Sequence, residues 1–310
     1  MNNLITIVLP LFALIGCGYL AGRTKLLSAS TNGGLNAFVY YFSLPAMLFR
    51  ALALRQMGTG LHLGFLGAWF TAGALVYLLT FVVARWGFKA SLGEAAIQGL
   101  GAEFPNSGYL ALPLVVSLFG PALAVPIALT LLIDMTLFLS ITLVLLEIGG
   151  RSGGSLKQLL LDLAKALGLN PLIISIWAGV VYPLLGLSLP LPLGRFLETL
   201  GQAATPSALF ALGVSLYGRT LSSRRNELAF MTVTKLVVHP VLVLVLTIFV
   251  FPVPPAWVLA AVLTAAVPSA SSVFVVAQRY EVYQEQASAL VLITTVLGIG
   301  TLTLVIHWLT

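Results

Sequence analysis

Long apolar runs separated by short polar connections dominate the sequence. The hydrocarbon core of a bilayer is about 30 Å thick, so a helix needs about 20 apolar residues to cross it. Ten stretches meet this requirement and predict ten transmembrane helices of an all-α polytopic membrane protein. They are residues 4–21, 34–54, 62–85, 94–119 and 122–147 in the first half, and 170–188, 195–217, 228–251, 256–279 and 286–308 in the second.

The longest polar stretch, residues 149–168, divides these helices into two sets of five. We interpret residues 1–148 and 169–310 as two five-helix repeats joined by this linker. Because five is an odd number, the second repeat must enter the membrane in the opposite orientation. Prolines at matching positions support the repeat, since Pro45 precedes Pro105 by 60 residues and Pro206 precedes Pro268 by 62. Inverted repeats of this kind are typical of alternating-access transporters.

The composition agrees with a chain that faces lipid. Hydrophobic residues make up 59% of the chain and charged residues only 8%, with a mean hydropathy of +1.07. A soluble domain usually carries about 25% charged residues. The net charge of +6 does not indicate nucleic-acid binding, because the basic residues never gather into a patch with interleaved aromatics.

The distribution of the cations predicts the topology. Cytoplasmic loops of membrane proteins are enriched in Lys and Arg. This rule places both termini outside and the 149–168 linker in the cytoplasm. The predicted inner side carries Arg23, Lys25, Arg85, Lys89, Arg151, Lys157, Lys165, Arg219, Arg224, Arg225 and Arg279, and the outer side carries Arg50, Arg55 and Arg195.

Two of the predicted helices contain helix-breaking residues near their middle. Proline removes a backbone donor and clashes with the preceding turn, and non-helical backbone is tolerated at membrane depth only where it lines protein or a cavity. One interpretation is ordinary proline kinks. The other is a pair of broken, crossing helices whose half-helix N-termini, each with a partial positive charge, bind an anion. The residues concerned are Pro105, Asn106, Ser107 and Gly108 in 94–119, and Pro268, Ser269, Ser271 and Ser272 in 256–279.

Three charged residues lie inside apolar runs, where a charge costs several kcal/mol. Asp134 and Lys235 lie within the helices predicted at 122–147 and 228–251, and Glu103 precedes the first break by two residues. Asp134 and Lys235 are predicted to pair when no substrate is bound, or the lysine neutralises the half-helix C-termini; a purely structural bridge is the alternative. Glu103 is either a proton-coupling carboxylate or a side chain that faces cytoplasmic water.

The stretch Phe104-Pro-Asn-Ser-Gly-Tyr-Leu-Ala-Leu-Pro-Leu114 resembles the helix-4 motif of the auxin efflux carrier family, which includes plant PIN proteins and bacterial malonate and malate permeases. Ser43 to Ala46, Lys235 with Pro240, and Pro268 to Ala277 also resemble that family. The resemblance implies a fold similar to sodium/proton antiporters and bile-acid symporters. Helices 1, 2, 6 and 7 would form a scaffold, helices 3–5 and 8–10 a transport domain, and Asn106 a substrate contact. The sequence departs from the family at Tyr280-Glu281, where Tyr-Gly is expected.

These observations predict a secondary transporter of a small organic anion, such as malonate, malate or an auxin-like weak acid, working by an elevator mechanism in a bacterial inner membrane. The alternatives are a cation/proton antiporter or sodium-coupled symporter of the same architecture, and a non-transporting membrane sensor. Expected partners are the lipid bilayer, a coupling proton or Na⁺, and a second copy through the scaffold helices. No nucleotide-binding, nucleophile-elbow or metal-ligand spacing occurs, so we expect no enzyme, cofactor or metal.

Overall fold

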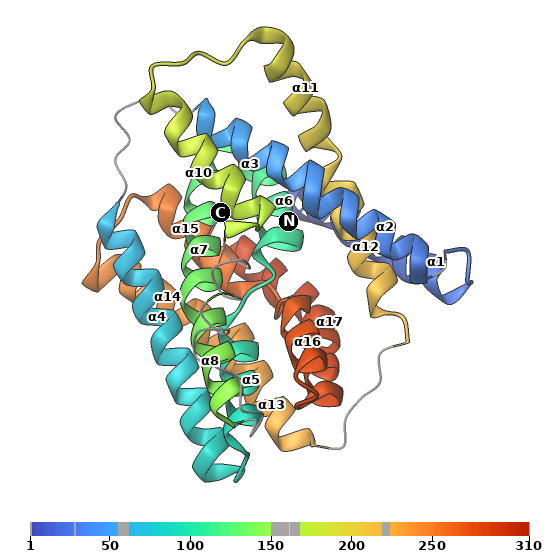
Figure 1. Ribbon diagram of the computed structural model, residues 1–310, viewed down its shortest axis with the longest axis vertical. Coiled ribbons are helices and arrows are strands. Elements are labelled where there is room, and N and C mark those ends of the chain that lie inside the picture. Colours follow the sequence, from blue (N-terminus) through green and yellow to red (C-terminus); the bar gives the residue numbers. More distant parts are fainter. Residues whose placement is uncertain are drawn as a thin grey trace. The chain divides into compact units, whose positions relative to one another are not determined.

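The structure is a computed structural model that describes residues 2–27, 29–54, 62–149, 161, 168–218 and 224–309. Nearly all of the described chain that has regular structure is helical (Figure 1), apart from one antiparallel bridge between Pro105 and Ser269. The prediction of an all-α polytopic membrane protein is therefore confirmed. The predicted linker, 149–168, lies outside the described residues except at Gly149, Leu161 and Gly168.

Within the described residues, five continuous helices are long and apolar enough to cross a membrane, and three shorter apolar helices accompany them. The helix predicted at 195–217 is divided at Ala203, which separates α11 from α12. The long helices are Thr31–Ala53, Leu63–Gly87, Pro121–Gly149, Arg225–Val250 and Gln284–Leu309, and the shorter ones are Ser107–Phe119, Pro171–Leu184 and Pro255–Ala266.

The chain forms two compact units. Unit 1 takes residues 1–61, 108–128 and 166–218, and unit 2 takes 62–107, 129–165 and 219–310. The helices of unit 1 are α1 (Asn2–Arg23), α2 (Ala29–Phe38), α3 (Leu44–Ala53), α6 (Leu112–Phe119), the first half of α7 (Ala124–Ile133), α10 (Pro171–Leu184), α11 (Leu191–Gln202) and α12 (Ala204–Leu216). A π-helical segment, Val39–Ser43, joins α2 to α3.

Glycines allow α1 and α12 of unit 1 to pack closely. A Cβ atom added at Gly18 would overlap the carbonyl of Phe210, and one added at Gly213 would overlap the carbonyl of Ile15. Because any side chain would separate the two backbones, the small residues set the spacing of this helix pair.

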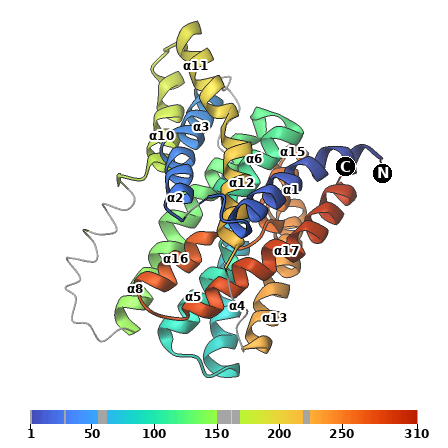
Figure 2. The same ribbon diagram turned by 90° about the vertical axis from the view of Figure 1, so that its right-hand side faces the viewer.

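Unit 2 contains α4 (Leu63–Val82), α5 (Leu92–Glu103), α8 (Leu139–Gly149), α13 (Arg225–Val233), α14 (His239–Val245), α15 (Pro255–Ala266), α16 (Ser271–Arg279) and α17 (Gln284–Leu309). In both views α16 lies beside α17, and α5 beside α4 (Figure 2). Two π-helical segments, Asp134–Phe138 and Thr234–Val238, widen the helices that carry the buried charges. Such bulges are frequent at functional sites.

Local hydrogen bonds explain how these helices begin and how their polar side chains tolerate an apolar setting. Ser91 and Glu94 form a capping box at the start of α5. Inside α17, the Thr294 and Thr295 hydroxyls donate to carbonyls four residues earlier, at 2.7 and 2.6 Å. These bonds satisfy the hydroxyl protons within α17, and the Thr294 oxygen also accepts from the Ser269 backbone N–H at 3.2 Å.

A polar network joins the starts of α5, α13 and α17. Arg224 contacts Glu94 at 2.9 Å and lies over the ring of Tyr283, whose hydroxyl donates to Glu227 at 2.5 Å. Burial, and then the hydrogen bond to Glu227, raise the pKa of the Tyr283 hydroxyl, so that it remains a donor at physiological pH. The network fixes this end of unit 2.

Candidate functional site

The helix predicted at 94–119 is interrupted at its proline. α5 ends at Glu103, and Phe104 is extended, with φ −74° and ψ 102°. Helical structure resumes in the π-helical segment Ser107–Ala111. Pro105 cannot donate to the preceding turn, which explains why α5 ends here.

The helix predicted at 256–279 is interrupted in the same way. α15 ends at Ala266, Val267 is extended with φ −68° and ψ 156°, and α16 begins at Ser271. Residues that precede proline are biased towards extended backbone, so Pro268 explains the conformation of Val267.

The two interruptions pair with one another inside unit 2. The backbone N–H of Asn106 donates to the Pro268 carbonyl at 2.9 Å, and the N–H of Ala270 donates to the Phe104 carbonyl at 3.0 Å. The Ser269 hydroxyl donates to the Gly101 carbonyl at 2.6 Å. These bonds satisfy backbone groups that the broken helices leave free.

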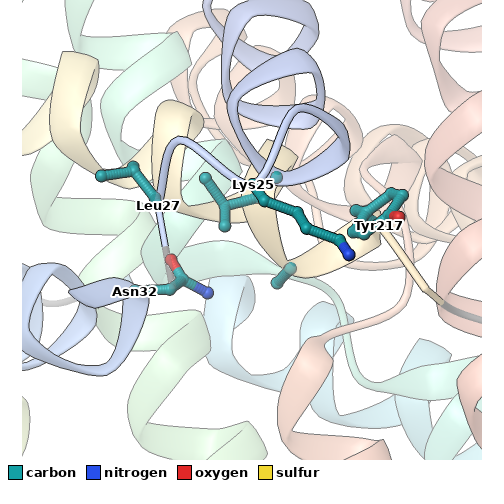
Figure 3. A pocket seen from close by; sticks show the side chains of 7 residues that line it. Lys25, Leu27, Asn32 and Tyr217 are labelled. Atoms are coloured by element: carbon teal, nitrogen blue, oxygen red, sulfur yellow. The ribbon is translucent and has the colours of Figure 1, made fainter. Parts of the chain in front are cut away.

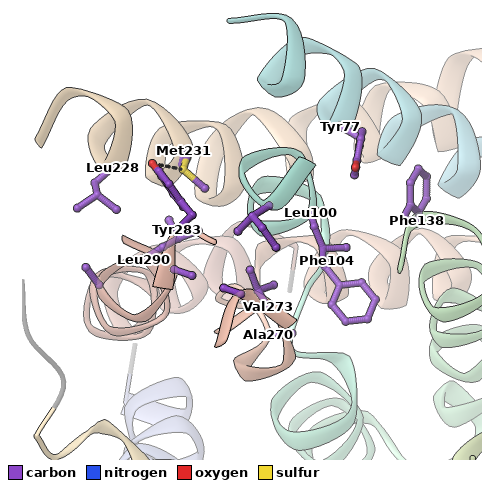
Figure 4. Close-up of a cluster of buried hydrophobic side chains, with 14 of the residues drawn as sticks. Tyr77, Leu100, Phe104, Phe138, Leu228, Met231, Ala270, Val273, Tyr283 and Leu290 are labelled. Carbon is purple, nitrogen blue, oxygen red and sulfur yellow. Dashed lines mark hydrogen bonds between the residues drawn. The ribbon is translucent and has the colours of Figure 1, made fainter. Parts of the chain in front are cut away.

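Apolar packing holds the paired segments on both sides. Phe104 and Ala270 belong to a buried cluster with Leu100, Val273 and Leu290 (Figure 4). Because protein interiors are close-packed, the side chains of this cluster hold the two extended segments in place against one another.

Lys235 lies behind the paired segments and is fully buried. Its ammonium group donates to the carbonyl of Glu103, the last residue of α5, at 3.2 Å, and to the carbonyl of Ala265, at the end of α15, at 3.1 Å. Helix C-termini carry a partial negative charge. The geometry is therefore that of the second sequence-based alternative, in which the lysine neutralises the half-helix C-termini.

Asp134 and Glu103 also lie in this region, and both are fully buried. One Asp134 oxygen, Oδ1, accepts a hydrogen bond from the indole N–H of Trp69 at 2.7 Å. Within the described residues, Asp134 Oδ2 and both Glu103 carboxyl oxygens have no donor. The structure therefore brings together three residues that the sequence singled out, and adds Trp69.

Of the predicted substrate contacts, Asn106 and Ser107 are buried beside the pairing. In the described part of the chain, the Ser107 hydroxyl has no hydrogen-bond partner, and the Asn106 side chain is 4% exposed. Ser271 and Ser272 are half-buried in the first turn of α16, and Pro105 and Pro268 lie within the paired segments. Gly108 lies in the π-helical segment Ser107–Ala111 and belongs to unit 1.

Sequence reasoning did not identify Trp69 as a partner of Asp134, or His239 as one of Lys235. Trp69 lies 65 residues from Asp134, and nothing in a hydrophobic run distinguishes a tryptophan that packs from one that also donates a hydrogen bond. His239 follows Lys235 by one helical turn, and that spacing was a usable signal.

The described residues also enclose cavities away from this site. A cavity of about 540 Å³ in unit 1 is lined by Lys25, Leu27, Asn32 and Tyr217, among others, and the Lys25 side chain extends towards Tyr217 (Figure 3). A second, of about 460 Å³ in unit 2, lies between α14, α15 and the end of α17. Neither contains a residue that the sequence marked as functional.

Known proteins resemble this chain along nearly its whole length. A putative malonate transporter of Rhizobium meliloti is 34% identical over 303 residues, which cover 98% of this chain and 95% of that protein. The uncharacterized transporter YfdV of Escherichia coli is 26% identical over 294 residues, covering 91% and 90%. The lysosomal cholesterol signaling protein of the mouse is 26% identical over 259 residues, covering 79% of this chain but 29% of that protein.

Residues 3–306 match the family described as membrane transport proteins. That range includes both helix interruptions and all the buried charged residues discussed above. The resemblance noted at Phe104 to Leu114 is thereby confirmed, and the chain belongs to this membrane transport protein family, that of the auxin efflux carriers.

Proposed function

We propose that this protein is a secondary transporter of a small organic anion, which binds where the two interrupted helices meet. The observation that carries the proposal is the position of Lys235, whose ammonium contacts the carbonyl ends of both α5 and α15. With the negative helix ends compensated, the positive N-terminal end of α16 is left to attract a carboxylate.

The free polar groups beside the pairing support the same proposal. The Asn106 amide and the Ser107 hydroxyl are both buried, and the hydroxyl lacks a partner within the described residues. A buried polar group without a partner costs free energy, so the Ser107 hydroxyl is placed to bind a ligand, with the Asn106 amide one residue before it. An amide N–H₂ and a hydroxyl can both donate to a carboxylate.

For the substrate, we propose a dicarboxylate of the size of malonate. The supporting observation is the relative from Rhizobium meliloti, which is named as a putative malonate transporter and aligns over 98% of this chain. Malate and an auxin-like weak acid are the other substrates that we propose to test.

We further propose ten transmembrane helices in two inverted five-helix repeats, with broken helices 4 and 9 crossing and an elevator motion. The paired interruptions at Pro105 and Ser269 support this architecture. So does the grouping of 62–107, 129–165 and 219–310 in one compact unit, which covers most of the proposed transport domain. Residues 108–128, the second half of helix 4 and the start of helix 5, group instead with the scaffold segments.

Two other functions have less support. A cation/proton antiporter or sodium-coupled symporter would use Asp134 as its ion site, but neither the Rhizobium meliloti relative nor YfdV is named for such an activity. The second is a non-transporting sensor in the lipid bilayer. Its support is the name of the mouse relative, and this chain covers 29% of that protein. We propose the bacterial inner membrane as the location, with a homodimer through the scaffold helices.

The test is exchange and uptake of labelled malonate, malate, pyruvate and indole-3-acetate by the purified protein in proteoliposomes. Asn106→Ala should weaken the apparent affinity about tenfold or more, because a hydrogen bond to a charged group contributes about 1.5–3 kcal/mol. Asn226→Ala, at an exposed position near the start of α13, is the matched control and should behave as the wild type. Wild-type transport by the Asn106→Ala variant would disprove the site, and no exchange of any of the four anions would disprove the function.

A further inference from the structure

A cluster of ionisable side chains lies behind the anion site. It consists of Glu103, Asp134, Lys235 and His239, with the indole of Trp69 against it, and all five residues are at most 1% exposed. They come from separate places in unit 2: α4, α5, the two π-helical segments and α14. Charges this deeply buried are retained only where they are paired or functional.

The hydrogen bonds of Lys235 are all used. An ammonium group has three donors. Two go to the Glu103 and Ala265 carbonyls, at 3.2 and 3.1 Å, and the third is directed to His239 Nδ1 at 3.1 Å. The lysine therefore has no donor left for either carboxyl group of the cluster.

The carboxyl groups of Glu103 and Asp134 both lie against α4: Glu103 Oε1 would be 3.1 Å from a Cβ added at Gly73, and Asp134 Oδ1 accepts from Trp69, one helical turn away. Three of their four oxygens lack a donor within the described residues: Glu103 Oε1 and Oε2, and Asp134 Oδ2. Two ionised carboxylates cannot hydrogen-bond, because both only accept. If one of them carries a proton, it donates to the other, and the contact becomes favourable.

The net charge of the cluster also favours one added proton. Two carboxylates and one ammonium leave a net charge of −1 in a buried site, with His239 neutral. One added proton makes the cluster neutral, which removes the cost of an uncompensated buried charge. Binding of a metal cation, in place of the proton, is disfavoured by the adjacent ammonium. Among the described residues, no group of three or more His, Cys, Asp or Glu side chains is arranged to hold a metal ion.

We propose that Glu103 and Asp134 share a single proton, and that this proton is the ion coupled to anion transport. The inference rests on the proposed function, since it names the coupling ion of that site. The proton comes from water on one side of the membrane, binds a carboxyl oxygen of the pair while the anion is bound, and leaves to water on the other side. No covalent bond other than O–H forms or breaks.

Electrostatic repulsion provides the coupling. Glu103 precedes Asn106 by three residues, so a deprotonated, negatively charged cluster disfavours an anion at the pairing, and a protonated cluster does not. Anion and proton therefore bind together, and by linkage each raises the affinity for the other. One proton with a monoanion is electroneutral, whereas one proton with a dianion carries a net negative charge.

Three other titratable side chains, those of Tyr77, His239 and Lys235, lie around the pair. The Tyr77 hydroxyl, on α4, contacts Thr142 Oγ1 at 2.9 Å and the Ala96 carbonyl at 3.3 Å. His239 accepts from Lys235 through Nδ1 and, if neutral, holds its own proton on Nε2. As an ammonium group, Lys235 offsets the partial negative charge of both helix ends.

The first test uses the wild-type protein alone. Malonate is added to the detergent-purified protein in weak buffer with a pH-indicator dye, at pH values where malonate itself does not titrate. We expect about one proton taken up per malonate bound, and an apparent dissociation constant that rises up to tenfold per pH unit once the pair ionises. Binding without proton uptake, at every pH tested, would refute the shared proton.

The second test uses Glu103→Gln, which leaves Asp134 and Lys235 as a neutral cluster without a proton. We expect malonate exchange by this variant to lose its pH dependence, and an imposed pH gradient to stop driving accumulation. Glu147→Gln, the same change in α8 and outside the pair, should keep both properties.

The outcomes separate the two proposals. If wild-type proteoliposomes exchange none of the tested anions, the proposed function fails. If they exchange malonate but a Na⁺ gradient, and not a pH gradient, drives its accumulation, anion transport stands and the proton inference fails. Retention of pH-driven accumulation by Glu103→Gln has the same meaning. Since the dye measurement needs no variant, misfolding of Glu103→Gln does not remove the test.

Discussion

At the scale of single residues, the position of Lys235 places strict requirements on the length and charge of its side chain. It is fully buried and uses all its donors on two helix ends and an imidazole. No shorter or uncharged side chain can make these three contacts, and an arginine presents its donors in a flat fork of different shape.

Lys235→Met is therefore predicted to destabilise the protein strongly. Removing one partner of a buried charged network costs about 3–5 kcal/mol, because the remaining carboxylates and helix ends lose their compensation. Thermal unfolding in detergent measures the loss, and Lys89→Met, at an exposed position, is the control. An unfolding midpoint of Lys235→Met equal to that of the control would contradict the role we assign to this residue.

The residue types in the cluster were evident from the sequence, since Glu103, Asp134 and Lys235 each stand out in an apolar run. Their contacts were not. The sequence left open whether Lys235 pairs with Asp134 or with helix ends, because both are compatible with its position along a helix. The structure has the ammonium on the carbonyls of Glu103 and Ala265, which lie 132 and 30 residues away.

At the scale of helices, the turn between α16 and α17 explains a departure from the family pattern. Glu281 has φ 55°, in the left-handed region, at the position where the resemblance leads us to expect glycine. Only glycine adopts this conformation without a steric penalty. Glu281 therefore adds backbone strain to this turn.

Glu281→Gly is accordingly predicted to stabilise the protein by about 1 kcal/mol. The expected readout is a higher unfolding temperature in detergent, with malonate exchange unchanged, since Glu281 is remote in sequence from both interruptions. Glu285→Gly, in the first turn of α17, is the matched control and should lower the midpoint, because glycine is unfavourable inside helices. A destabilised Glu281→Gly variant would show that the glutamate side chain makes a contribution we have not identified.

At the scale of the whole molecule, the ion pairs agree with the topology expected from the cations. Arg50, which was predicted to lie outside, pairs with Glu198 at 3.2 Å within unit 1, and Glu198 follows the predicted outer residue Arg195 by three positions. Arg224, which was predicted to lie at the cytoplasmic side, pairs with Glu94 at 2.9 Å within unit 2, and Glu94 follows the predicted inner residue Lys89 by five positions. Each pair requires its two segments to end on the same side of the membrane.

Single-cysteine labelling tests this topology. Cys17 is the only cysteine, so Cys17→Ser provides a background without thiols. In that background, an impermeant maleimide should label Glu198→Cys in intact cells, and Arg279→Cys only after permeabilisation. Both positions are exposed. The reverse labelling pattern would invert the proposed orientation, and labelling of both from outside would rule out the ten-helix topology.

The sequence by itself determined the class of the protein and the location of its breaks. Both depend on local chemistry: the length of apolar runs that lipid requires, and the inability of Pro105 and Pro268 to continue a helix. The motif beginning at Phe104 also identified the family.

Only the tertiary structure decided which buried groups meet. The donation from Trp69 to Asp134 and the bonds of Lys235 to the Glu103 and Ala265 carbonyls join residues from different helices. Helical periodicity states which face a side chain occupies on its own helix, but not which helix lies opposite. That choice depends on how all the apolar faces pack together, and it determines where a proton and an anion can be held.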